Sequence, residues 1–93
     1  MSDVKEQIDQ LIKDNEVVLF MKGTRMFPQC GFSQRSVDLL KRTGAKFKDV
    51  NVLADPAVRQ GIKDYSNWPT IPQIYIKGEF VGGSDILIEM YES

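Results

Sequence analysis

Cys30 is the only cysteine in the 93-residue sequence, and its neighbours favour a reactive thiolate. A lone cysteine is more often a small buried apolar side chain. Here, however, Pro28 ends a loop just before the cysteine, and a helix is predicted to begin near it. Helix-start N–H groups and the positive end of the helix dipole both favour a thiolate. Lys22 and Arg25 are expected to add positive charge nearby, and Gly31 permits close approach of a bound molecule.

The residue types that are missing narrow the chemistry of this thiol. Without histidine or a second cysteine, the chain has no Cys–His nucleophile pair, no imidazole zinc site and no internal disulfide. Ser33 stands where a Cys-x-x-Cys motif has its second thiol. Its hydroxyl either hydrogen-bonds the sulfur or belongs to an ordinary capping or solvated serine. In both cases, Cys30 can form a disulfide only with an external thiol.

A second group of residues suits an extended, anionic ligand. A cis bond between Ile71 and Pro72 would turn the Ile71 backbone outward to pair with a peptide, whereas a trans bond would merely start a strand. Lys22, Arg59 and Lys63 are candidate carboxylate ligands, although each alone is more often a surface charge. Arg59 and Lys63 are four residues apart and therefore share one helix face.

The segment Gly83-Ser84-Asp85 opens the predicted last helix, where free N–H groups form an anion site. Asp85 is either a plain N-cap or an acceptor for a ligand ammonium group, and these two roles are compatible. Together with Cys30, the site suits a ligand with a central thiol, a carboxylate at each end and an amine at one end. Glutathione has this pattern.

The elements that position these residues are short and alternate along the chain. Helices are indicated by apolar spacing, and strands by short β-branched or alternating runs. The order α-β-α-β-α-β-β-α implies a right-handed βαβ crossover followed by an antiparallel hairpin, and hence an α/β fold with a four-stranded mixed sheet flanked by helices. The predicted elements are a helix through 4–12, a strand at 16–21, a helix from Cys30 to Gly44, a strand near 47–52, a helix after Asp55-Pro56, strands at 73–76 and 79–81, and a last helix carrying Ile86, Leu87 and Met90.

Composition limits the partner classes. Twelve basic and thirteen acidic residues give a net charge of −1, so no overall basic field recruits nucleic acid. No apolar run approaches the ~18 residues of a membrane span, and the N-terminus lacks the features of a signal or transit peptide. We therefore expect a single domain over 1–93, no nucleic-acid or membrane partner, and a cytoplasmic location. An organelle matrix remains open if a transit peptide has been removed.

Four motifs are spread over nearly the whole chain: Met21-Lys22-Gly23-Thr24, Cys30-Gly31-Phe32-Ser33, Trp68-Pro69-Thr70-Ile71-Pro72-Gln73 and Gly82-Gly83-Ser84-Asp85-Ile86. In their order and spacing, they resemble the monothiol glutaredoxins of the CGFS type. The resemblance implies a thioredoxin-like fold with Pro72 cis, in a single glutaredoxin domain. Many members carry a cysteine where this chain has Ser84, so an intramolecular disulfide with Cys30 is excluded.

The resemblance also implies the site residues and the cargo. In this family, a [2Fe–2S] cluster bridges two subunits, each of which supplies its CGFS cysteine and one bound glutathione. Such a cluster needs about four thiolates, so a dimer of this chain must obtain two from external thiols. The implied glutathione site is lined by Lys22, Arg59, Ile71, Ser84 and Asp85, with Phe32 and Lys63 as neighbours and Thr70, Pro72 and Gly83 from the same motifs.

Three functions remain open at this point. The first is a homodimeric iron–sulfur carrier for cluster storage, transfer and iron homeostasis, with Cys30 as metal ligand and apo iron–sulfur proteins as clients. The second is a glutathione-dependent thiol–disulfide oxidoreductase that removes glutathione from proteins, with Cys30 as nucleophile. The third is a regulatory module that pairs with BolA-like proteins.

Overall fold

The computed structural model describes residues 3–83, 85–86 and 88–89. Residues 85–86 and 88–89 have helical backbone conformation, whereas Ser84, Leu87 and Met90 of the predicted last helix lie outside the described residues. The element order predicted up to the hairpin is confirmed. The elements are α1 (Val4–Asp14), β1 (Val17–Met21), α2 (Gly31–Thr43), β2 (Lys48–Asn51), α3 (Pro56–Ser66), β3 (Gln73–Ile76) and β4 (Glu79–Gly82).

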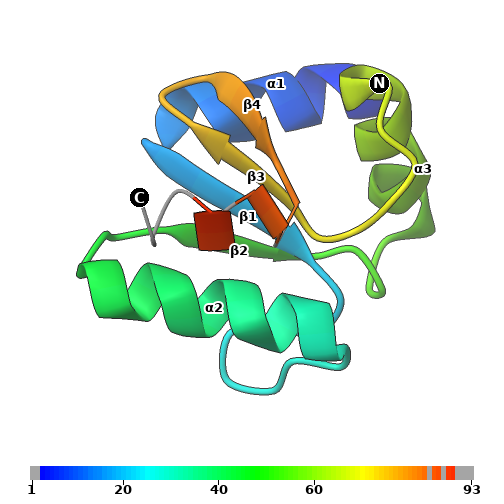
Figure 1. Ribbon diagram of the computed structural model, residues 1–93. Coiled ribbons are helices and arrows are strands. Elements are labelled where there is room, and N and C mark those ends of the chain that lie inside the picture. The colour runs from blue at the N-terminus through cyan, green and yellow to red at the C-terminus, as the bar shows by residue number, and fades with distance from the viewer. Residues whose placement is uncertain (1–2, 84, 87, 90–93) are drawn as a thin grey trace.

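The four strands form one mixed sheet in the order β2-β1-β3-β4. β1 pairs in parallel with β2, Val18 facing Lys48, and antiparallel with β3, Val18 facing Tyr75. β3 and β4 form the predicted antiparallel hairpin. α1 and α3 cover one face of the sheet, and α2 covers the other (Figure 1). This is the thioredoxin-like arrangement that the motifs implied.

β1 is the centre of the core, because all five of its residues are buried. Val18 and Phe20 belong to the apolar cluster shared with α1 and α3, whereas Leu19 and Met21 belong to the cluster shared with α2. Alternate side chains of a strand point to opposite faces, so a continuously apolar strand serves two cores. The prediction of a strand buried on both faces is confirmed.

The helix ends follow their local signals. Cys30 is the N-cap of α2, and Gly44 ends that helix in the left-handed region at φ 74°. Asp55 caps α3 by accepting hydrogen bonds from the N–H groups of Ala57 and Val58, and Pro56 occupies the first turn. These caps determine where the α2 and α3 side chains enter the site.

The Cys30 loop, residues 22–29, is held against β2 by two polar side chains. Asn51 Oδ1 accepts the N–H of Gly23 at 2.9 Å. Asp49 accepts both the backbone N–H of Arg25 at 3.0 Å and its Nε–H at 3.1 Å. The Arg25 guanidinium also donates to the Phe47 carbonyl and lies over the Phe47 ring, 4.0 Å from its centroid. Arg25 therefore anchors the loop to β2 rather than serving as a charge for Cys30, which corrects the sequence expectation.

Replacing Asp49 by alanine is expected to lower the free energy of unfolding by about 1–2 kcal/mol, because two N–H groups of Arg25 lose their acceptor. Burial raises the pKa of Asp49, but the Arg25 donors outweigh it and hold the pKa below 3.8. The stabilisation is therefore complete at neutral pH and is lost as the pH falls through the folded-state pKa. Urea unfolding at pH 7 measures the loss.

The matched control is Asp38→Ala, on the exposed face of α2. The side chain of Asp38 has no hydrogen bond or ion pair with another described residue. Its replacement is expected to change stability by no more than about 0.5 kcal/mol. Equal losses in the two variants would contradict the anchoring role of Asp49.

Candidate functional site

Cys30 lies half-buried where the Cys30 loop meets α2. The backbone N–H of Ser33 lowers the pKa of the thiol below its ordinary value of 9.0; burial opposes this shift, but the Phe32 N–H, the charge of Lys22 and the Ser33 hydroxyl reinforce it. N–H groups at a helix start supply the largest favourable contribution because they are fixed dipoles beside the sulfur. The thiolate predicted for this position is thus favoured by its surroundings.

Ser33 is fully buried and joins two parts of the site. Its hydroxyl oxygen accepts the backbone N–H of Lys22 at 3.1 Å, which links the end of β1 to the first turn of α2. The interpretation of Ser33 as a solvated serine is therefore wrong. Its hydroxyl also lowers the pKa of Cys30, so one buried side chain acts on both the loop and the sulfur.

Cys30 opens into a groove of about 740 Å³. The groove is bounded by the start of the Cys30 loop, α2, α3, the segment before β3 and the segment after β4. Nine of the ten predicted ligand-binding residues line it together with Cys30, and the tenth, Ser84, lies outside the described residues. The groove is lined by Lys22, Cys30, Phe32, Arg59, Lys63, Trp68, Pro69, Thr70, Ile71, Pro72, Gly83, Asp85 and Ile86.

The Ile71–Pro72 peptide bond is cis, so the trans alternative is wrong. Within the described part of the chain, no other residue hydrogen-bonds to the Ile71 backbone. The segment 68–70, which precedes this bond, is held in place by the buried side chain of Gln73. Its Nε2 donates hydrogen bonds to the carbonyls of Trp68 at 3.0 Å and Thr70 at 3.1 Å. The groove thus has a supported wall with a free backbone edge, which an extended peptide can pair with.

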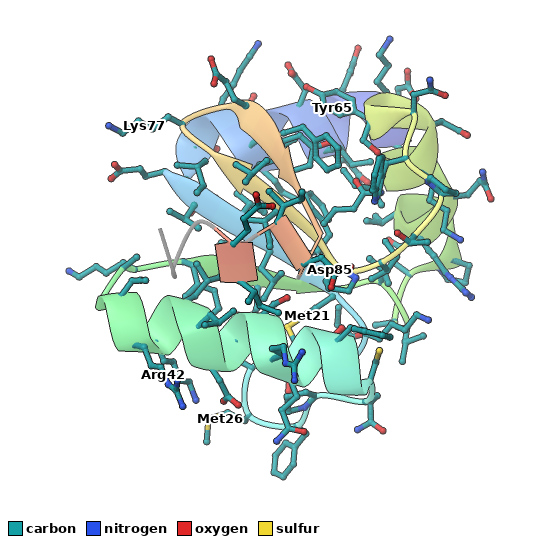
Figure 2. All side chains as sticks on the ribbon, viewed as in Figure 1. Met21, Met26, Arg42, Tyr65, Lys77 and Asp85 are labelled. Atoms are coloured by element: carbon teal, nitrogen blue, oxygen red, sulfur yellow. The ribbon has the colours of Figure 1, made fainter. Side chains whose placement is uncertain are left out.

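The charges that line the groove are mostly positive. Among its described lining residues, Lys22, Arg59 and Lys63 are cationic, and Asp85 is the one carboxylate. Figure 2 shows Asp85 near the N-terminal end of α2, where the C-terminal segment approaches the Cys30 side of the sheet. The groove therefore suits a ligand with more than one carboxylate and a single cationic group beside a thiol.

Three lining residues were not among the predicted site residues: Trp68, Pro69 and Ile86. Trp68 is 42% exposed, and its ring lies 5.9 Å from that of Phe80. The signal for the first two was their position directly before Thr70-Ile71-Pro72. Ile86 of the predicted last helix is 39% exposed and lines the groove. Phe32, exposed to 58%, makes the groove rim partly apolar.

Comparison with known sequences gives one family. The glutaredoxin family model matches residues 17–81. A Synechocystis protein described as an uncharacterized monothiol glutaredoxin ycf64-like is 58% identical over 91 residues, which cover 98% of this chain and 85% of that protein. The chloroplastic monothiol glutaredoxin-S14 of Arabidopsis thaliana is 52% identical over 90 residues, and the match covers 97% of this chain but only 52% of that protein.

Solved structures give the same result for the fold. Reduced apo GrxS14 from poplar has a TM-score of 0.84 at 54% identity, with 96% of this chain and 82% of that chain covered. A truncated monomeric mutant of Trypanosoma brucei 1-C-Grx1 has a TM-score of 0.88 at 47% identity, with 99% and 84% covered. Among the described residues, no helix is both long enough and apolar enough to span a membrane.

Proposed function

This chain belongs to the glutaredoxin family, with monothiol glutaredoxins as its relatives, and from that premise we propose that it binds glutathione and carries a [2Fe–2S] cluster between two subunits. The proposed role is storage and transfer of clusters in iron homeostasis. The observation that carries it is a lone thiol of lowered pKa, Cys30, opening into a cationic groove with a free backbone edge.

Glutathione matches this groove group by group. Its thiol lies beside Cys30, and its cysteine backbone pairs with Ile71 as a neighbouring strand would. Lys22, Arg59 and Lys63 bind its two carboxylates, and Asp85 accepts its ammonium group. Phe32, Thr70, Pro72 and Gly83 complete the walls in this proposal. Ser84, which the sequence also assigned to the site, is retained as a ligand through its backbone N–H.

The donor set supports a shared cluster. The described residues contain no group of three or more His, Cys, Asp or Glu side chains that could hold a metal ion. A [2Fe–2S] cluster needs about four thiolates, and a symmetric dimer of this chain supplies two, one Cys30 from each copy. Two bound glutathiones supply the remainder. A cargo held partly by diffusible ligands is suited to delivery to apo iron–sulfur proteins.

Anaerobic reconstitution with iron, sulfide and glutathione tests this function. We expect a coloured dimer on size-exclusion chromatography, with one cluster and two glutathiones per two chains. Cys30→Ser should remain colourless, and omission of all added thiols should prevent cluster formation. Colour that persists in Cys30→Ser, or that forms equally well without a thiol, would overturn the proposal.

A pair of variants tests the role of the cationic groove in glutathione binding. Arg59→Gln/Lys63→Gln removes two groove charges and is expected to lower the bound glutathione per chain. Lys77→Gln is the control, because Lys77 lies in the β3–β4 turn far from the groove (Figure 2). A glutathione content that falls equally in both variants would contradict binding at the groove.

A second candidate function has one specific observation in its favour. The lowered pKa of Cys30 favours the nucleophile that a glutathione-dependent oxidoreductase needs. Cys30 would attack the mixed disulfide of a glutathionylated protein, and a second glutathione would release the glutathione taken up by Cys30. The test is the rate at which a glutathionylated peptide loses its glutathione. A rate with the protein and glutathione that is no higher than the rate with glutathione alone would leave the carrier function as the better proposal.

BolA-like proteins are further proposed partners of the cluster carrier. Their binding is detectable as a change in the cluster spectrum when the two proteins are mixed.

A further inference from the structure

The basic side chains of this protein are concentrated around α2. Residues 22–48 contain seven Lys and Arg residues but only one acidic residue, Asp38. This segment therefore has a net charge of +6, whereas the remainder of the chain has −7. The overall charge of −1 therefore hides an excess of basic residues in the segment that contains the Cys30 loop and α2, although Arg25 of this segment is paired with Asp49. Such an excess orients the protein toward anionic partners.

The outer face of α2 presents this charge to solvent. Arg35, Lys41 and Arg42 are exposed. None of them forms an ion pair with another described residue. Arg35 and Arg42 also line a shallow hollow of about 200 Å³ that begins at Gly31, directly after Cys30. Asp38 lines the same hollow, so the exposed face of α2 carries three basic side chains and one acidic one. Since α2 rises ~1.5 Å per residue, the basic face extends roughly 18 Å from the sulfur to Arg42.

An apolar pair lies at the tip of the Cys30 loop. Met26 and Phe27 are 71% and 73% exposed, the largest values among the exposed large apolar residues. They are presented by a closed turn, in which Thr24 and Phe27 exchange backbone hydrogen bonds of 3.1 and 3.3 Å. Figure 2 shows Met26 and Arg42 projecting from the same side of the molecule, away from the sheet. Exposed apolar side chains on a held turn are typical of interface anchors.

We propose that Met26–Phe27 and the basic face of α2 (Arg35, Lys41 and Arg42) form a docking surface for a protein partner with an acidic surface. The surface lies outside the groove residues and brings the partner to Cys30. The inference rests on the proposed function only in taking Cys30 as the reacting group. Charge complementarity selects an acidic partner, and the apolar pair provides the contact that excludes water.

An acidic protein is favoured over a nucleic acid or a membrane. The basic face is short, and the remainder of the chain is acidic, so a long polyanion would meet repulsion beyond it. Two apolar side chains without an amphipathic helix provide little area for insertion into lipid. A protein interface of ordinary size covers about 800 Å² on each partner, which a surface of this length accommodates.

The experiment measures thiol exchange at Cys30 with two peptides of ten residues. Each peptide carries one cysteine as a disulfide with thionitrobenzoate and a pair of leucines, and the peptides differ only in having four glutamates or four lysines. The Cys30 thiolate attacks the peptide sulfur, a Cys30–peptide disulfide forms, and thionitrobenzoate leaves with the electron pair of the broken bond. Its absorbance gives the rate. Iodoacetamide, which is neutral, measures the intrinsic reactivity of Cys30 in each variant.

We expect the glutamate peptide to react about tenfold faster than the lysine peptide at low ionic strength, with the difference declining as salt is added. Arg35→Glu/Arg42→Glu should remove most of this preference without changing the iodoacetamide rate. Lys5→Glu/Lys77→Glu makes the same change of net charge on exposed residues elsewhere and should retain the preference. Phe27→Ser should slow both peptides about threefold.

The proposal is overturned if the glutamate peptide has no advantage, or if both double variants lose it equally, because net charge would then explain the preference. An unchanged rate of thiol exchange in Phe27→Ser would show that the apolar pair is not part of the docking surface. Arg35/Arg42-dependent binding to phosphatidylglycerol vesicles or to a 20-nucleotide single strand, with no peptide preference, would assign the surface to lipid or nucleic acid instead. The assay needs neither glutathione nor a cluster, so its failure is distinguishable from failure of the proposed function.

Discussion

Replacing Gly23 by alanine is expected to lower the free energy of unfolding by about 3 kcal/mol. Gly23 has φ +92°, a backbone region that is costly for residues with a Cβ atom. The added Cβ would also lie 2.5 Å from the Phe27 carbonyl oxygen and 2.7 Å from the Gln29 nitrogen. Both are backbone atoms of the Cys30 loop, so the clash cannot be relieved by rotating a side chain.

The loop would have to open at the Gly23–Pro28 bridge, and this displacement would extend to Cys30. We therefore expect Gly23→Ala to alter the alkylation rate of the thiol as well as the urea midpoint, with the m-value unchanged. Gly31→Ala is the matched control, because its added Cβ has no atom within 4 Å and its φ is not positive. Its stability should be equal to or slightly above that of wild type. Equal urea midpoints for Gly23→Ala and wild type would show that the loop relaxes at no cost.

Replacing Ser33 by alanine is expected to raise the pKa of Cys30 toward 9.0 and to lower the free energy of unfolding by about 1–3 kcal/mol. The pKa rises because the thiolate loses the Ser33 hydroxyl, although the helix-start N–H groups remain. The stability falls because the backbone N–H of Lys22 loses its buried acceptor. The pH dependence of iodoacetamide alkylation measures the first effect, and urea unfolding measures the second.

Ser36 offers a matched control on the same helix. It is also fully buried, but its hydroxyl donates to the carbonyl of Phe32, four residues earlier in α2. Ser36→Ala is therefore expected to leave the alkylation midpoint of Cys30 unchanged, with a stability loss of about 1 kcal/mol or less. A shifted midpoint in Ser36→Ala, or an unshifted one in Ser33→Ala, would contradict the specific role of Ser33.

The same pKa gives a signed effect on stability. Because the folded state lowers the pKa of Cys30, the unfolded chain binds more protons between the folded-state pKa and 9.0. The free energy of unfolding of the wild type should therefore rise with pH across that window and level off above 9.0. Cys30→Ser should lack this rise, and Ser33→Ala should show a smaller one.

Local signals in the sequence predicted most of the fold. The continuous apolar run at Val17–Met21, the glycine at 44 and the Asp55-Pro56 pair each act within a few residues, so their structural meaning does not depend on the rest of the chain. Motif resemblance identified nine residues that line one groove, although they come from five separate segments. Spacing alone would not have brought those segments together, because their proximity depends on the packing of α2 and α3 on opposite faces of the sheet.

By itself, the sequence determined that Cys30 stands at a helix start, that this chain offers it no second thiol, and that cations and a proline-containing segment are available to form a site. Only the tertiary structure decided which of these groups act on the sulfur. Arg25, in the Cys30 loop, forms an ion pair with Asp49 on β2. Ser33, in contrast, is buried and accepts the backbone N–H of Lys22. The physical reason is that hydrogen-bond partners far apart in the chain are chosen by strand pairing and burial. Cys30 owes its position to local sequence and its surroundings to the fold.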